Sequence, residues 1–113
     1  MKFHPFNLRR RIIAWNYRNK RYKEVIIQCE RLLKKNPDEM FLLERRARAN
    51  VSLRNWEIAL LQLRQVFTID PNYLDCASLL ARCAIYTKSW SDIEQVAIRR
   101  PKILSAGKIL RAY

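Results

Sequence analysis

The chain has 113 residues, 50% hydrophobic and 29% charged, which predicts one soluble domain and excludes two large ones. Lysine and arginine total 23 against 10 aspartates and glutamates, and the net charge of +13 favours polyanions or acidic protein surfaces as partners. A single glycine and four prolines leave few residues for tight hairpin turns. This composition argues against an all-β fold and favours helices joined by short connections.

Apolar residues recur at spacings of three and four along the chain, and short polar segments interrupt this pattern at regular distances. The stripes include Leu8, Ile12 and Trp15 near the start of the chain. Because the polar segments are short, helices that follow one another are expected to be antiparallel. The predicted helices span residues 6–19, 22–35, 38–53, 56–69, 72–87, 90–100 and 101–112.

An internal repeat of about 34 residues organises these helices. Pro37 and Pro71 lie one repeat length apart, and the aromatic residues Tyr22, Trp56 and Trp90 have the same spacing. Such a repeat indicates stacked helical hairpins, because a single hairpin cannot bury its own apolar stripe. We expect the three aromatic residues to pack between adjacent hairpins rather than to anchor a partner.

The middle unit carries the small residues Ala47 and Ala59 at the repeat's close-packing positions, followed by Leu63, Val66 and Pro71. This pattern resembles the tetratricopeptide repeat, a helical hairpin of about 34 residues. The resemblance implies a single all-α domain, a right-handed superhelical solenoid of three hairpins with a C-terminal capping helix. The domain covers residues 1–113, with repeats at about 6–39, 40–73 and 74–100 and the capping helix at 101–113.

The outer units depart from the pattern. Ile13 and Val25 are larger than the small residues of the middle unit, so the first two helices are expected to lie farther apart. Pro101 precedes the closing position of the third unit by four residues, which predicts a shortened second helix there. The amphipathic segment after Pro101 is expected to cap the solenoid. Docking of this segment on an anionic membrane or on a partner is the alternative.

Catalytic chemistry is not predicted. The only histidine is His4, and the three cysteines are widely spaced with no C-x-x-C pair, so we expect no metal site, no cofactor, no disulfide framework and no enzymatic activity. Cys76 and Cys83 lie seven residues apart and are expected to be small apolar residues on one helix face. Reduced cysteines predict a cytoplasmic protein, with the periphery of a membrane or a larger complex as alternatives.

In repeats of this kind the first helix of each hairpin lines a concave surface, and here those helices carry mainly arginine with aromatic residues at the edges. Guanidinium groups bind carboxylates in a bidentate manner, which predicts an adaptor, scaffold or assembly factor that binds an acidic segment of a partner protein. The opposing interpretation is that the arginines only hydrate the surface and that Glu44 pairs with one of them, one helical turn away. The predicted groove residues are Arg10, Tyr17, Arg45, Arg48, Arg82 and Tyr86.

Two other hypotheses remain open. Residues 1–35 contain 11 basic and 2 acidic residues, which favours nucleic-acid or anionic-membrane binding through the N-terminal region. The chain could also be a structural subunit of a larger complex, with self-association or neighbours covering its apolar ends. The candidate polyanion-binding residues are Arg10, Arg11, Arg18, Lys20, Arg21 and Lys23.

Overall fold

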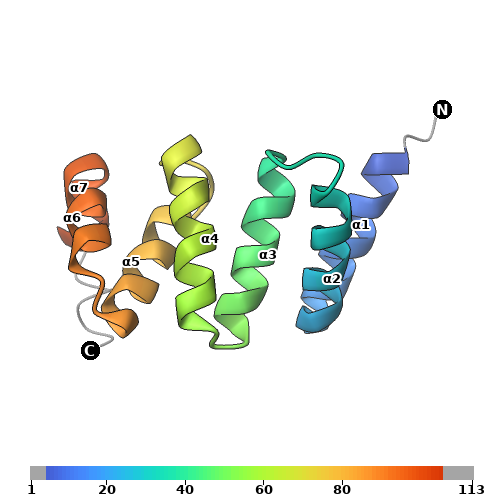
Figure 1. Cartoon of the computed structure of the whole chain (residues 1–113), viewed down its shortest axis with the longest axis horizontal. Coiled ribbons are helices and arrows are strands. Elements are labelled where there is room, and N and C mark those ends of the chain that lie inside the picture. Colours follow the sequence, from blue (N-terminus) through green and yellow to red (C-terminus); the bar gives the residue numbers. More distant parts are fainter. Residues whose placement is uncertain (1–4, 106–113) are drawn as a thin grey trace.

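The computed structural model describes residues 5–105, and every regular element in that range is an α-helix. Figure 1 shows the helices packed side by side in chain order along an axis of 45 Å. This arrangement confirms the predicted all-α solenoid of helical hairpins. The helices are α1 (Pro5–Arg18), α2 (Tyr22–Leu33), α3 (Met40–Ser52), α4 (Trp56–Ile69), α5 (Cys76–Thr87), α6 (Trp90–Arg99) and α7 (Pro101–Ser105).

The hairpins are α1–α2, α3–α4 and α5–α6, and a continuous core runs through them. Ala47 and Ala59 are fully buried, and their small side chains allow α3 and α4 to approach closely. The connections within hairpins lie along one edge of the solenoid, and the connections between hairpins lie along the opposite edge (Figure 1). First helices and second helices therefore present separate surfaces.

The start of α5 differs from the predicted boundary for a local reason. Helix α5 begins at Cys76, because the Asp70 carboxylate accepts a hydrogen bond from the backbone N–H of Asn72 and Leu74 has a φ of 43°. The predicted shortening of the third hairpin is confirmed, since α6 ends at Arg99 and α7 begins at Pro101. Residues 106–112 of the last predicted helix lie outside the described range.

Apolar residues of the first and last hairpins are more exposed than the repeat pattern predicts. Leu8, Ile12 and Trp15 are exposed, because α1 is the terminal described helix and its inner side, with Ile13 in the core and Tyr17 packed against it, faces the other way. A pocket of about 320 Å³ lies between α1 and α2, in keeping with the wider first hairpin predicted from the enlarged residues. The expectation that Trp90 is buried is wrong.

The exposure of Trp90 has a structural reason. Trp56 stacks on Tyr86 of the next hairpin, with ring centroids 4.3 Å apart and an interplanar angle of 12°. Trp90 holds the equivalent position in the third hairpin and is 60% exposed, because no further hairpin follows α6 within residues 5–105.

The three cysteines are buried, as expected for Cys76 and Cys83. Burial raises the pKa of Cys29 to about 12 and the pKa of both Cys76 and Cys83 to about 11. The thiols are therefore protonated at neutral pH and contribute packing.

Each hairpin uses the same turn. Lys20, Arg54 and Lys88 occupy equivalent positions of the repeat and have φ angles of 60°, 61° and 58°. In each turn the next residue donates its backbone N–H to a carbonyl five residues earlier, as Asn55 does to Asn50 at 2.9 Å. This is the Schellman motif, whose left-handed position is usually glycine because a Cβ atom is unfavourable there.

Replacing Arg54 by glycine is expected to raise the free energy of unfolding by about 0.5–1 kcal/mol, because relief of the left-handed backbone outweighs the added chain entropy. The measurement is urea denaturation of Arg54→Gly beside Arg54→Ala, which keeps a Cβ atom. A glycine variant less stable than the alanine variant would contradict this account of the turn.

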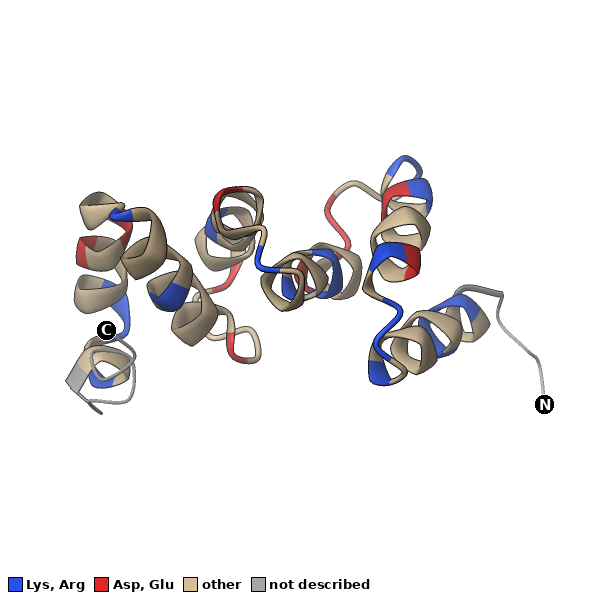
Figure 2. Ribbon diagram, turned by 90° about the horizontal axis from the view of Figure 1, so that it is seen from below, with Lys and Arg blue, Asp and Glu red and all other residues tan. Residues whose placement is uncertain are grey.

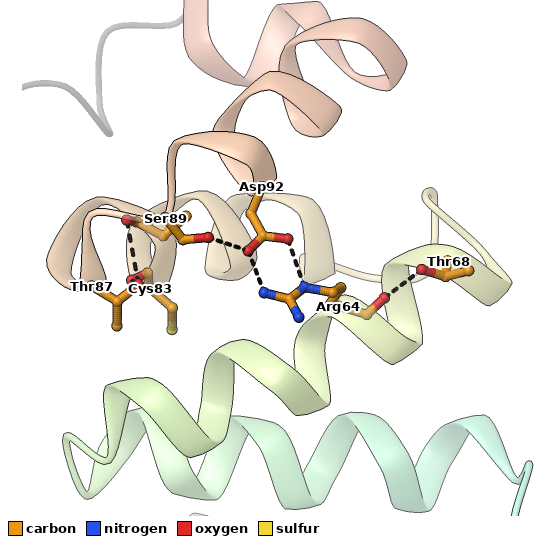
Figure 3. A network of polar contacts seen from close by, with 7 residues as sticks. Arg64, Thr68, Cys83, Thr87, Ser89 and Asp92 are labelled. Atoms are coloured by element: carbon orange, nitrogen blue, oxygen red, sulfur yellow. Dashed lines mark hydrogen bonds and ion pairs between the residues drawn. The ribbon is translucent and has the colours of Figure 1, made fainter.

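A bidentate ion pair joins the second and third hairpins (Figure 3). Arg64 on α4 donates from Nε and Nη2 to the two carboxylate oxygens of Asp92 on α6, at 2.8 and 2.7 Å. The hydroxyl of Ser89 also donates to Asp92, which is only 4% exposed. The hydrogen bonds from Arg64 hold the pKa of Asp92 below its usual value.

The Asp92→Asn variant is expected to lower the free energy of unfolding by about 1–2 kcal/mol at neutral pH, a moderate loss because Arg64 can return to water. The pKa of Asp92 is lower in the folded chain, so the contribution is present above the ordinary carboxyl pKa. It disappears as the pH falls through the folded value. Urea denaturation of both proteins from about pH 7 to about pH 3 measures this. A stability difference that stays constant or grows on acidification would refute it.

Candidate functional site

An arginine–aromatic cluster joins the first helices of the first two hairpins. The guanidinium carbon of Arg45 lies 5.0 Å from the ring centroid of Tyr17 and 5.2 Å from that of Phe41. Arg10 on α1 lies 5.2 Å from the Phe41 ring. Aromatic faces attract cations at these distances, so the two rings fix the positions of both guanidinium groups. We call Arg10, Tyr17, Phe41, Arg45 and Arg48 the arginine cluster.

A buried carboxylate pairs with two arginines of this cluster. Glu44 is fully buried on α3, and it accepts a hydrogen bond from Nε of Arg48, as the spacing of one helical turn predicts. Burial disfavours the charged form of Arg48, but the charge and hydrogen bond of Glu44 outweigh it and raise the pKa of Arg48. Nη2 of Arg48 also lies 4.0 Å from a carboxylate oxygen of Asp75. Arg10 forms an ion pair with Glu39.

Arg45 retains hydrogen-bonding capacity. Its Nε atom lies 3.8 Å from Oε2 of Glu44, which is too far for a hydrogen bond. Both of these atoms are buried and lack a hydrogen-bond partner in the described chain. The side chain of Arg45 is 21% exposed, so the terminal nitrogens of this guanidinium group, which lies over two rings, are suited to donate to a carboxylate of another molecule.

The structure brings together four of the six predicted groove residues, Arg10, Tyr17, Arg45 and Arg48. Arg82 is exposed on α5. Tyr86 lies near the α3–α4 connection, where it stacks on Trp56.

Sequence reasoning missed Phe41, Glu39 and Tyr73. Burial raises the pKa of Tyr73, and the charges of Glu44, Arg10, Glu39 and Arg45 also act on it. Tyr73 therefore shares the neighbourhood of the arginine cluster. The positions equivalent to Phe41 in the neighbouring repeats hold asparagine and aspartate, so the repeat alignment carried no signal for an aromatic residue there.

The candidate polyanion-binding residues lie in three places. Arg10 faces α3 and pairs with Glu39, whereas Arg11 and Arg18 are exposed on α1. The other three, Lys20, Arg21 and Lys23, line a shallow pocket of about 400 Å³ at the α1–α2 connection.

Within residues 5–105, no helix combines the length and the apolar character needed to cross a membrane. The same part of the chain contains no group of three or more histidine, cysteine, aspartate or glutamate side chains arranged to hold a metal ion.

Comparison with known proteins gives one family and no curated relative. No curated protein matches the chain. Residues 18–98 match the family described as anaphase-promoting complex, cyclosome, subunit 3, whose members are built from repeats of the tetratricopeptide type. Because this match extends from the end of α1 to α6 and covers well over half of the sequence, the chain belongs to that family.

Proposed function

We propose that the chain is a non-catalytic protein-interaction module, acting as an adaptor or as a subunit of a larger assembly, that binds an acidic segment of a partner at the arginine cluster. Repeats of the tetratricopeptide type are generally non-catalytic interaction modules, and the family is named for a subunit of a complex. Family membership supports the general role. The acidic ligand rests on the cluster itself.

The observation that carries the proposal is the state of Arg45. Tyr17 and Phe41 hold its guanidinium group, so little side-chain entropy is lost when a ligand binds. Its Nε atom is buried, but the side chain as a whole is 21% exposed, so its terminal nitrogens can donate to a ligand. A carboxylate of the partner would accept hydrogen bonds from these terminal nitrogens, and an apolar side chain beside it would contact the two rings.

Nearby carboxylates reduce the positive charge of the arginine cluster. Glu39 and Glu44 neutralise part of the positive charge, and the exposed Asp75 lies beside Arg48. A ligand carboxylate that approaches Arg48 therefore meets repulsion from Asp75. The cluster is expected to prefer a segment with spaced carboxylates and an apolar residue between them over a continuous acidic run.

The test is calorimetric titration of the chain with a synthetic glutamate-rich peptide that contains one central phenylalanine. We expect Arg45→Gln to weaken binding about 10-fold, as loss of a charge-assisted hydrogen bond does. We expect Asp75→Asn to strengthen it about 2-fold to 3-fold, because an exposed repulsive charge is removed.

The matched control is Arg31→Gln, which removes the same charge from the exposed surface of α2. It should leave the affinity nearly unchanged. The proposal is refuted if the peptide does not bind, or if Arg31→Gln and Arg45→Gln weaken binding equally, since the effect would then reflect net charge alone.

A further inference from the structure

The two edges of the solenoid carry opposite charge. The connections within hairpins, residues 19–21, 53–55 and 88–89, contain four basic residues and no acidic one. The connections between hairpins, residues 34–39 and 70–75, contain two basic and four acidic residues. Figure 2 views the first of these edges and shows basic residues in all three of its connections. We call this the turn edge, and its basic residues are Lys20, Arg21, Arg54 and Lys88.

Three of the four basic residues of the turn edge occupy an unfavourable backbone conformation. Lys20, Arg54 and Lys88 have left-handed φ angles, where glycine or asparagine is less costly. A basic residue stands at this position in all three repeats. Strain that recurs at equivalent positions indicates that the side chains serve a purpose other than stability. These turns lie along one edge of the solenoid and Lys20, Arg54 and Lys88 are exposed, so the repeat places a row of cationic residues there.

Exposed aromatic rings accompany the cations. Trp15 is 49% exposed, with the guanidinium carbon of Arg21 lying 5.5 Å from its ring centroid. Tyr86, which is 51% exposed, stacks on Trp56 and lines a pocket of about 380 Å³ that also includes Arg54. Trp90 is 60% exposed and follows the third connection directly. Each connection thus has an exposed aromatic residue beside it.

We propose that the turn edge binds single-stranded nucleic acid, with phosphates at the basic residues and unpaired bases on the exposed rings of Tyr86 and Trp90. A positively charged track with aromatic platforms is the usual means of binding a single strand without sequence preference. The bases of a duplex are already stacked and cannot use these rings. The cations form one line across the hairpins, which suits a flexible linear polyanion better than a flat lipid surface. This function goes beyond acidic-peptide binding and uses different residues.

The test is fluorescence anisotropy with a labelled oligouridine of about 20 nucleotides, measured over a range of salt concentrations. The variant Lys20→Ala with Arg54→Ala and Lys88→Ala should bind at least about 10-fold more weakly at low salt. It should also lower the slope of log affinity against log salt by about two, because each phosphate contact to a single strand contributes about 0.7. Trp90→Ala alone should weaken binding about 10-fold through lost stacking.

Two further triple variants separate the site from net charge and from folding. Arg31→Ala with Lys34→Ala and Lys35→Ala removes the same charge near the opposite edge and should change the affinity by less than about 3-fold. Glycine in place of alanine at the three turn positions should weaken binding as the alanine variant does while keeping the melting temperature at or above that of the wild type.

Several results would overturn the proposal. Equal losses in the turn-edge and opposite-edge variants would show that only net charge matters. Tighter binding to a duplex of the same length, or to vesicles containing phosphatidylserine, would assign the edge to another ligand. An unchanged affinity in Trp90→Ala would remove the stacking role.

Discussion

Replacement of Leu63 by alanine is expected to lower the free energy of unfolding by about 3 kcal/mol. Leu63 is fully buried on α4, at the centre of the middle hairpin and of the continuous core. Its truncation loses transfer free energy and leaves a cavity that close-packed neighbours fill only in part. Because each hairpin of a solenoid depends on its neighbours, unfolding should remain cooperative across α1 to α6. Urea denaturation followed by circular dichroism measures the change.

Leu61 provides the matched control, since it lies two residues away on the same helix and is 60% exposed. Leu61→Ala should change the free energy of unfolding by less than about 0.5 kcal/mol, as most exposed substitutions do. Comparable losses in the two variants would mean that Leu61 is as buried as Leu63, which would contradict the structure.

Substitution of Glu44 by glutamine is expected to act in opposite directions on stability and on binding. Glu44 is fully buried and pairs with Arg48 and Arg45, so neutralising it should cost about 2 kcal/mol, less than in a fully buried pair because both arginines reach solvent. The same change frees positive charge in the arginine cluster. Affinity for the glutamate-rich peptide should therefore rise by about 3-fold or more.

Denaturation and calorimetry of the same protein measure both effects. Glu57→Gln is the control, because Glu57 is an exposed glutamate on α4 that lies outside the cluster. It should leave stability and peptide binding near the wild-type values. A Glu44→Gln protein that is less stable and also binds the peptide more weakly would contradict the role assigned to the cluster.

The fold could be predicted from the sequence because its determinants repeat. Pro37 and Pro71, the aromatic residues Tyr22, Trp56 and Trp90, and the spacing of three and four recur in a register that stacked hairpins satisfy. Where the determinant is local, prediction also succeeded. Pro101 ends the third hairpin early, as expected.

Interactions that break the repeat could not be predicted. Arg64 and Asp92 bond across two hairpins, yet the equivalent positions one repeat earlier hold glutamate and isoleucine, so no equivalent pair signals the contact. The start of α5 depends on a side-chain bond of Asp70 that competes with the helix. The exposure of Trp90 depends on whether another hairpin packs against α6, which periodicity does not encode.

Only the part of the site that lies at aligned positions of the first helices could be predicted from the sequence. Alignment of equivalent positions indicated Arg10, Arg45 and Arg48, and the structure brings these three close together. The ring of Phe41 lies 5.2 Å from the guanidinium carbons of both Arg10 and Arg45, a contact between α1 and α3 that the repeat does not encode. The left-handed turns could not be read from the sequence, since lysine and arginine rarely adopt that conformation.

The most direct test of the central claim is amide chemical-shift mapping of the isotopically labelled chain during titration with the glutamate-rich peptide. If the arginine cluster binds acidic partners, the largest changes should centre on Tyr17, Phe41 and Arg45 and remain within α1, α3 and α5. Changes centred on α2, α4 and α6, or along the turn edge, would contradict the claim and place the peptide on another surface.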